Sequence, residues 1–279
     1  MKSAEVKRIC GQAFDQLAEA LEQGRSPQLL RYLRAMGMFH RYSLANSMLI
    51  FWQKPEATHV AGFGTWRKLG RHVKKGMKGI AIMAPVLYRR SKKHQEEGPD
   101  ENEDEEVFGY RTVYVFDVSQ TSGRPLAECA QAAGDPGLYM DRLKQLVAQK
   151  GIELSYSEKL RTCHGYSAGG RIVLNSQLQG AEAFSTLVHE MAHELLHRDD
   201  SAAANRTIRE IEAEAVAFVV CAGIGLEMNT ASSDYIQLYD GEKEHLMKSL
   251  GRIQGTAAEI LDAITAERKE EQPLVATAA

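Results

Sequence analysis

The chain has 279 residues, of which 44% are hydrophobic and 25% are charged, and its formal net charge is -3. These values fall in the range of a soluble globular protein of one or two domains. The longest apolar run, residues 215–226, is shorter than the roughly 20 residues of a membrane span, so we expect a buried helix there and no membrane partner.

The N-terminus and the cysteines indicate the cellular compartment. Residues 1–24 place charges among apolar positions at helical spacing and contain no continuous hydrophobic stretch, which excludes a secretory signal of the usual kind. The four cysteines, Cys10, Cys129, Cys163 and Cys221, form neither a close pair nor a zinc-knuckle spacing. Free thiols in a reducing compartment are the better interpretation, and we expect a cytoplasmic location.

The small net charge hides a strong asymmetry along the chain. Residues 1–95 contain 18 Lys or Arg against 5 Asp or Glu, whereas residues 96–279 contain 16 against 32. Ten of the cations lie between residues 57 and 95 without an acidic residue among them, a composition that favours salt-sensitive binding of a polyanion. Eight acids follow within residues 96–106; this run is too polar to pack and predicts a solvated loop, the alternative being a shield over the basic stretch.

Hydrophobic periodicity and turn residues predict the order of the elements. The expected elements are helices over 3–23 and 28–53, strands over 79–88 and 109–120, a linker at 132–137, a helix over 138–150 and a strand over 170–175. The acidic run is then the loop of a hairpin. We predict an α+β protein with one domain over 1–130, including a mobile acidic loop at 90–108, and a second domain over 137–279.

A helical histidine motif, FSTLVHEMAHELLH at 184–197, predicts a catalytic zinc site. At 100° per residue, His189 and His193 lie about 40° apart and one turn up the same face, so both rings can reach one ion. Glu190 lies beside that ion without being a ligand and can take a proton from a water whose pKa zinc lowers to about 7. Chance histidines are the alternative; the apolar residues around the motif and the preceding strand favour the site.

The third ligand is sought in the acidic helix at 209–218. Glu214 is the predicted ligand because it shares a face with the apolar residues three positions before and four positions after it, where a buried carboxylate needs a metal or a partner. Glu210 is the alternative ligand, or an acceptor behind a ligand histidine. Glu212 is expected to point elsewhere, into solvent, and His197 to cap the end of the histidine helix.

The basic stretch interleaves aromatic residues with cations and glycines over residues 40–85. Aromatic rings stack on unpaired bases while cations follow the phosphates, which predicts binding of single-stranded nucleic acid. Core packing is the alternative for part of the aromatic residues, notably Phe51, Trp52 and Trp66.

Long segments of the chain resemble a known family. YSLANSMLI (42–50), ATHVAGFGTWRKLGR (57–71), VKKGMKGIAI (73–82) and GYRTVYVFDVSQT (109–121) resemble the N-terminal domain of the ArdC family of antirestriction proteins. HEMAHELLH with EAEAVAF is similar to the metallopeptidase-like C-terminal domain of that family. The resemblance implies an α+β nucleic-acid-binding domain followed by a zincin-like α+β metallopeptidase domain, in a protein of plasmids, phages or other mobile elements.

The resemblance also implies the partners. Family members bind single-stranded DNA nonspecifically and protect incoming DNA from restriction, and their second domain is similar to Spartan-type proteases, so cleavage of a DNA-bound protein or of the chain itself is expected. Spartan-like enzymes use a third histidine where this chain offers Glu214. The expected cofactor is one Zn²⁺, with Mn²⁺ or another divalent metal as alternatives.

Two functions of different classes follow. The first is a DNA-binding metallopeptidase with antirestriction activity; the second is an antirestriction factor that only occupies DNA and whose zinc site is structural or dormant. The intact Glu190 favours the first, because a structural site needs no general base. The candidate site residues are Glu190 for catalysis, His189, His193 and Glu214 for the metal, and Tyr42, Asn46, Phe63, Trp66, Arg67, Lys68, Arg71, Lys74, Lys75 and Lys78 for DNA.

Overall fold

A computed structural model of the chain describes most of its residues. The described ranges are 3–23, 26–88, 106–124, 135–160, 163–198, 206–227 and 243–266. Nearly all of the expected acidic loop at 90–108, as well as Cys129 and part of the expected linker at 132–137, lie outside these ranges. Within them, no helix combines the length and the apolar character that crossing a membrane requires.

Three helices open the chain: α1 (Ser3–Glu22), α2 (Ser26–Met38) and α3 (Leu44–Gln53). The first confirms the helix expected over 3–23. The single helix expected over 28–53 is wrong, because the chain turns between α2 and α3. Ser43 sets the start of α3: its backbone is extended and its hydroxyl accepts a hydrogen bond from the backbone N–H of Asn46, the usual way in which a serine begins a new helix.

The basic stretch folds around two small antiparallel sheets. The elements of this region, which extends beyond the basic stretch, are β1 (Val60–Gly62), α4 (Phe63–Lys68), β2 (Arg71–Val73), β3 (Ile80–Tyr88), β4 (Glu106–Asp117), the short 3-10 helix η1 (Val118–Gln120) and β5 (Thr121–Gly123). One sheet has the order β1-β4-β3 and the other pairs β2 with β5. Because β3 and β4 are paired antiparallel, with Ile82 opposite Val113, the expected pairing of strands on either side of the acidic run is confirmed.

Helix α3 closes the free edge of β3 with two side-chain amides. Asn46 accepts from the backbone N–H of Met83 (2.9 Å) and donates to its carbonyl (2.8 Å). Gln53 makes the same pair of bonds to Ala81, at 3.0 and 2.8 Å. An amide side chain offers one acceptor and two donors, so it can satisfy the backbone as a neighbouring strand does. These bonds fix the helix on the sheet and protect an edge open to unwanted pairing.

The second part of the chain builds a mixed sheet with helices. Its elements are α5 (Leu138–Gln149), β6 (Glu153–Ser157), β7 (Gly165–Ser167), β8 (Arg171–Asn175), α6 (Gly180–Leu196), α7 (Arg206–Gly223) and α8 (Lys243–Thr265). In the order β6-β8-β7, β6 runs parallel and β7 antiparallel to β8. The expected helix over 138–150 and the strand over 170–175 that leads into the histidine helix are confirmed, as is the α+β class.

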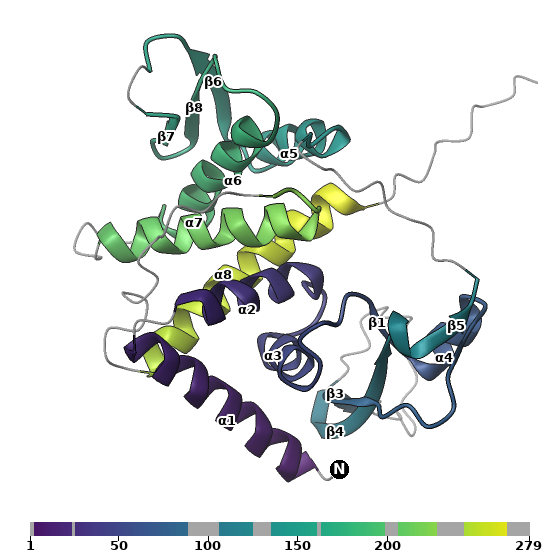
Figure 1. Ribbon diagram of the computed structural model, residues 1–279. Helices are drawn as coiled ribbons and strands as arrows, with labels where there is room; N and C mark the ends of the chain where they lie inside the picture. The colour runs from purple at the N-terminus through teal and green to yellow at the C-terminus, as the bar shows by residue number, and fades with distance from the viewer. Residues whose placement is uncertain are drawn as a thin grey trace, which may run out of the picture.

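The helices of the two parts share one hydrophobic core. Helices α7 and α8 cross the molecule between the two three-stranded sheets, and α2 lies along them (Figure 1). The core includes Leu33 of α2, Val219 of α7 and Ile253 of α8, all with no exposed surface. The apolar run at 215–226 therefore lies largely on a buried helix. The division into domains over 1–130 and 137–279 stays a prediction, since this core joins residues of both.

Candidate metal centre and nucleic-acid interface

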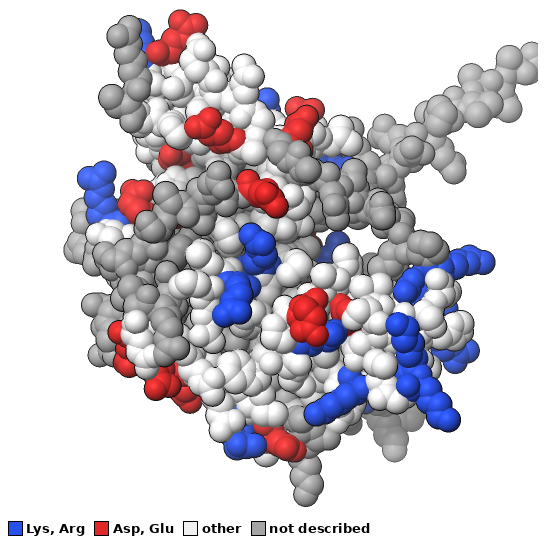
Figure 2. Space-filling view, in the orientation of Figure 1, with Lys and Arg blue, Asp and Glu red and all other residues white. Residues whose placement is uncertain are grey.

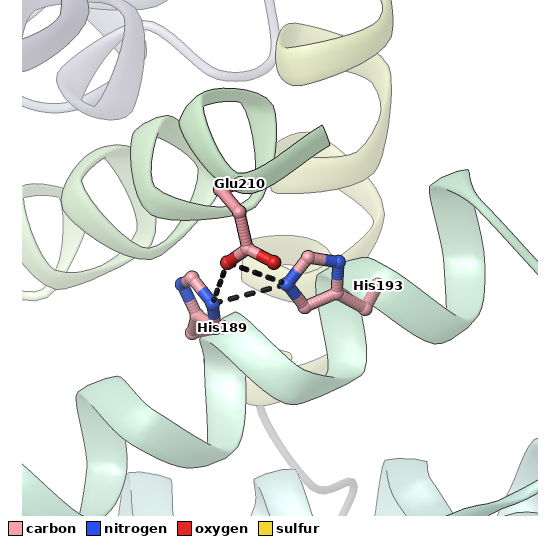
Figure 3. Close-up of side chains that lie close together, drawn as sticks. All are labelled: His189, His193 and Glu210. Atoms are coloured by element: carbon pink, nitrogen blue, oxygen red, sulfur yellow. Dashed lines mark hydrogen bonds and ion pairs between the residues drawn. The ribbon is translucent and has the colours of Figure 1, made fainter. Parts of the chain in front are cut away.

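Two helices bring together three side chains that could hold a metal ion. His189 and His193 lie one turn apart on α6, and Glu210 reaches them from near the start of α7 (Figure 3). The Nε2 atoms of the two histidines are 3.1 Å apart. The Oε2 atom of Glu210 is 3.5 Å from His189 Nε2 and 3.4 Å from His193 Nε2. The three atoms thus form a nearly equilateral triangle.

The size of this triangle fits one small divalent ion. With metal–nitrogen and metal–oxygen bonds of about 2.0–2.1 Å, donor atoms at the corners of a tetrahedron are about 3.3 Å apart. The observed separations of 3.1, 3.4 and 3.5 Å lie close to that value. Two histidines and one glutamate form the donor set of many catalytic zinc sites, which leave the fourth position open.

The electrostatics of the cluster also suit a metal ion. Burial, reinforced by the neighbouring His189, lowers the pKa of His193 to about 4. The hydrogen bond from the His189 side chain lowers the pKa of Glu210 to about 2, against the smaller opposing effect of burial. At neutral pH His193 is therefore a neutral imidazole and Glu210 a carboxylate, the protonation states that metal coordination requires.

The structure corrects two expectations on α7. Glu210, not Glu214, lies with the histidines, because the start of α7 lies beside them and Glu214 is one turn further along the helix. Glu212 is 1% exposed rather than solvated. Its carboxylate pairs with Arg252 Nη1 of α8 at 3.3 Å and lies 3.6 Å from His197 Nε2.

Glu190 lies in the wall of the pocket beside His189, as the motif predicts. Its side chain is 7% exposed. Burial raises its pKa above the ordinary value of a glutamate, although His189 and hydrogen bonds from Ser167 act in the opposite direction. A buried carboxylate of raised pKa is a stronger base than one in water, which suits proton transfer near neutral pH.

A pocket of about 630 Å³ surrounds these groups. It is lined by His189, Glu190 and His193 of α6, Gly165, Tyr166 and Ser167 of β7, and Arg206, Arg209 and Glu210 of α7. Because β7 is the edge strand of its sheet, part of the wall is backbone. Glu194 supports that wall from α6: its carboxylate accepts a 2.6 Å hydrogen bond from the backbone N–H of Gly170, in the turn between β7 and β8.

Some of the predicted DNA-binding residues are exposed, and the others hold elements of the fold together. Lys and Arg side chains gather on the side of the molecule where α4 and β5 lie (Figure 2). The exposed candidates are Phe63, Arg67, Lys68, Lys74, Lys75 and Lys78. Lys74 Nζ donates to the Ser119 carbonyl at 3.0 Å. Arg71 is half-buried, and its Nε donates to Thr121 Oγ1 at 2.8 Å, which ties β2 to β5.

The expectation that Trp66 stacks on bases is wrong. Its ring is 2% exposed, and Nε1 donates to the carbonyl of Phe116 at 2.9 Å, so it anchors α4 on β4. Tyr42 and Asn46 are also used by the fold: the Tyr42 hydroxyl donates to the Val60 carbonyl at 3.2 Å, and the Asn46 amide holds β3. Of the aromatic candidates, Phe63 alone is exposed, at 53%.

Sequence reasoning missed two exposed tyrosines beside this surface. Tyr110 and Tyr114 of β4 are 57% and 45% exposed. They lie four residues apart on a strand, where side chains alternate between faces, and therefore share one face of the sheet. The alternation of side chains between the two faces of a strand would have predicted from GYRTVYVFD that the two tyrosines share a face. The pocket arginines, Arg206 and Arg209, were missed as well, and no motif marks them.

The N-terminal region matches the model of a known family. Residues 7–116 match the family model of the N-terminal domain of anti-restriction factor ArdC. This region of the chain is therefore similar to the N-terminal domain of ArdC. This confirms the resemblance found in the segments from Tyr42 to Thr121.

Solved structures extend the similarity to the fold of nearly the whole chain. The manganese(II)-bound structure of the antirestriction ArdC protein from the R388 plasmid has a TM-score of 0.55 at 19% identity and covers 93% of this chain and 99% of its own. The metal-free structure of that ArdC protein has a TM-score of 0.52 at 17% identity, with 91% and 96% covered. At these identities the similarity shows a common fold.

A curated relative is the uncharacterized protein pXO2-81 of Bacillus anthracis. It is 24% identical over 307 aligned positions, which cover 92% of this chain. The chain spans about half the length of this relative, 51%.

Proposed function

We propose that this chain is an antirestriction protein of a mobile element that binds single-stranded DNA without sequence preference and cleaves a DNA-bound protein at a one-ion metallopeptidase site. The observation that carries the proposal is the convergence of His189, His193 and Glu210 beside the buried Glu190. A structural metal site would not need a buried base in the wall of an open pocket.

We propose Zn²⁺ as the ion, held by His189, His193 and Glu210. The donor set and its spacing support this choice, and the manganese(II)-bound ArdC structure from R388 supports a divalent metal in the same fold. Bound there, the ion would act as a Lewis acid toward the carbonyl of a peptide bond and toward water.

The side chains around the ion supply the rest of the chemistry. Glu190 takes a proton from the attacking water, whose oxygen forms a new bond to the carbonyl carbon. The carbon–nitrogen bond then breaks, and the proton held by Glu190 passes to the leaving amine. The outer edge of β7 offers backbone groups that pair with an extended polypeptide and place its carbonyl in the pocket.

The exposed cations of the basic surface supply DNA binding in this proposal. Arg67, Lys68, Lys75 and Lys78 are exposed, and their charged side-chain groups have no hydrogen-bond or ion-pair partner among the described residues. Free cations at a surface bind phosphates and release counterions, without reading the sequence of the bases. Phe63 of α4 and Tyr110 of β4 are exposed rings on which unpaired bases can stack.

The test is cleavage of a protein that coats single-stranded DNA. The zinc-loaded chain should produce fragments, by intact mass, when both DNA and the coating protein are present. Glu190→Gln should bind zinc and DNA and produce none. Glu182→Gln, a change at an exposed glutamate of the same helix outside the pocket, is the matched control and should cleave like the wild type.

The outcome separates the two functions of the sequence analysis. Fragments that require DNA and Glu190 support the peptidase. The absence of fragments from a chain that carries zinc and binds DNA would favour the protein that only occupies DNA.

A further inference from the structure

Two arginines form one wall of the candidate active site. Arg206 and Arg209 belong to the first turn of α7 and line the pocket together with Glu210, their neighbour on the same helix. Residues three and four apart lie on the same helical face, so this turn presents two cations and the metal-binding carboxylate to the same space. Arg206 is exposed and Arg209 is half-buried.

Neither arginine has a partner that explains its position. Among the residues that the structure describes, the side chains of Arg206 and Arg209 make no hydrogen bond and no ion pair. Arg252 in the neighbouring helix, by contrast, is held by the buried Glu212. Cations in the first turn of a helix also oppose the helix dipole, so the stability of α7 does not account for them either.

The charges in the pocket favour an anionic ligand. The two guanidinium groups balance the carboxylates of Glu190 and Glu210. A bound divalent ion would then leave the pocket with a net positive charge. An anionic group of the substrate would restore the balance, and arginine binds a carboxylate with two parallel hydrogen bonds.

We propose that Arg206 and Arg209 bind an acidic side chain of the polypeptide substrate, next to the peptide bond in the pocket. This inference rests on the proposed metallopeptidase function and names the class of its substrate. A polypeptide is favoured over a DNA phosphate because the opposite wall is the edge strand β7, with Gly165, Tyr166 and Ser167 facing the pocket. An extended chain paired there projects alternate side chains toward one face.

The experiment measures binding with the zinc-loaded Glu190→Gln protein, which does not consume its ligand. The probes are a short labelled peptide of alanine and serine with one central Glu, and the same peptide with Gln in that place. A single acidic residue keeps binding to the distant basic surface weak. We expect the Glu peptide to bind at least about tenfold more tightly by fluorescence anisotropy.

Substitutions assign this preference to the two arginines. With Arg206→Gln and Arg209→Gln added, the preference should fall below about twofold while the zinc content stays unchanged. The Lys substitutions at both positions should retain part of it. The control is Arg171→Gln, at an exposed arginine of β8 outside the pocket, which should leave the preference intact.

Three results would overturn the inference. They are equal affinity for the Glu and Gln peptides, a preference that survives both Gln substitutions, and displacement of the Glu peptide by single-stranded DNA whose own binding depends on Arg206 and Arg209. The last result would assign the arginines to a DNA phosphate. Because the assay requires no cleavage, it tests this inference even if the wild-type chain proves inactive. Cleavage without a preference for the Glu peptide would support the proposed peptidase function and contradict only this inference.

Discussion

Asp117 is a buried carboxylate at the junction of β4 with the basic stretch. It is 1% exposed and accepts hydrogen bonds from the backbone N–H groups of Thr58 (2.8 Å), His59 (3.2 Å) and Ser119 (2.9 Å). Burial raises its pKa, but the hydrogen bonds from Ser119, Thr58 and His59 outweigh burial and bring the pKa below its ordinary value. The ionised form is therefore the one that holds this junction.

Asp117→Asn should lower the free energy of unfolding by about 1.5–3 kcal/mol at pH 7. An amide is uncharged and has one acceptor oxygen, so it cannot replace a carboxylate that accepts hydrogen bonds at both of its oxygens. The folded-state pKa lies below the unfolded value of about 3.9. The contribution is therefore full above that value and is lost as the pH falls through the folded-state pKa. Urea unfolding at pH 7 and at about pH 3 measures the difference.

The exposed Asp141 on α5 provides the control. Asp141→Asn should change stability by less than about 0.5 kcal/mol. An equal penalty for Asp117→Asn at both pH values would contradict the assigned role of its charge.

Among single residues, the sequence correctly predicted those whose placement depends on one helix alone. His189, Glu190 and His193 follow from the helical period and are where the motif places them. Glu210 could not be chosen over Glu214 because the choice depends on where α7 crosses α6. The burial of Trp66 likewise depends on the approach of α4 to β4, which local pattern does not contain.

Two helices make a close contact that connects the N-terminal region with the metal site. A Cβ atom added at Gly37 of α2 would lie 2.4 Å from the Val219 carbonyl oxygen and 3.0 Å from the Gly223 nitrogen, both on α7. Backbones approach this closely only where a side chain is absent. Since α7 also carries Glu210, the contact links the region similar to the ArdC N-terminal domain to a candidate metal ligand.

Gly37→Ala should therefore destabilise the protein by about 1–3 kcal/mol, through overpacking between α2 and α7. Gly11 on α1 is the matched control, because an added Cβ there meets nothing within 4 Å. Gly11→Ala should stabilise by up to about 1 kcal/mol through helix propensity alone. Equal effects of the two substitutions in thermal unfolding would show that this contact is not tight.

An ionic cluster around the buried Glu212 joins the end of α6 to α7 and α8. Glu212 of α7 pairs with Arg252 of α8, and Arg252 Nη2 donates to the Leu196 carbonyl at 2.5 Å and lies 3.3 Å from His197 Nδ1, at the end of α6. This cluster fixes α7, and hence Glu210, against the histidine helix. His197 thus has a partner on another helix in addition to its place at the helix end.

Arg252→Met should cost about 3 kcal/mol or more, because the Glu212 charge would remain buried without its cation. The comparison is Arg41→Met, which breaks an ion pair with Asp262 whose side chains are 71% and 56% exposed. Its expected cost is about 0–1 kcal/mol. Chemical denaturation of both variants tests the contrast, and similar costs would argue against the cluster as a link between the helices.

The elements were only partly predicted from the sequence, which gave no expectation for β1, α4, β2, β5, β6 or α8. Apolar periodicity located α1, α5 and the strands β3, β4 and β8. The break between α2 and α3 was missed because the periodicity continues across it. The three-residue strand β7 was also missed, since so short an element owes its strand conformation to pairing with β8.

On the scale of the whole molecule, the basic surface and the candidate metal site lie in different parts of the structure. The exposed cations lie over α4 and the small β2–β5 sheet (Figure 2), while the candidate metal site lies between β7, α6 and α7. The sequence predicted these two functional regions. It did not predict that α1–α3 would pack on α7 and α8, because that packing joins residues far apart in the chain.

Lys75→Glu with Lys78→Glu should weaken binding of single-stranded oligonucleotides about tenfold or more, to a similar degree for all sequences. The slope of log affinity against log salt should become shallower by about 1.4, for two lost phosphate contacts. Titrations at several salt concentrations measure both quantities. The control is Lys144→Glu with Lys159→Glu, which makes the same charge change at exposed lysines outside the basic surface. An equal loss of affinity in this control would show that net charge alone explains the effect.

The central claim is that α6 and α7 together hold one divalent ion through His189, His193 and Glu210. It is tested most directly by elemental analysis of protein dialysed with zinc and then freed of unbound metal, repeated with manganese. We predict one ion per chain for the wild type and for Glu214→Gln, and loss of the ion for Glu210→Gln and His189→Ala. Retention of the ion by Glu210→Gln together with its loss from Glu214→Gln would contradict the account and restore the ligand expected from the sequence.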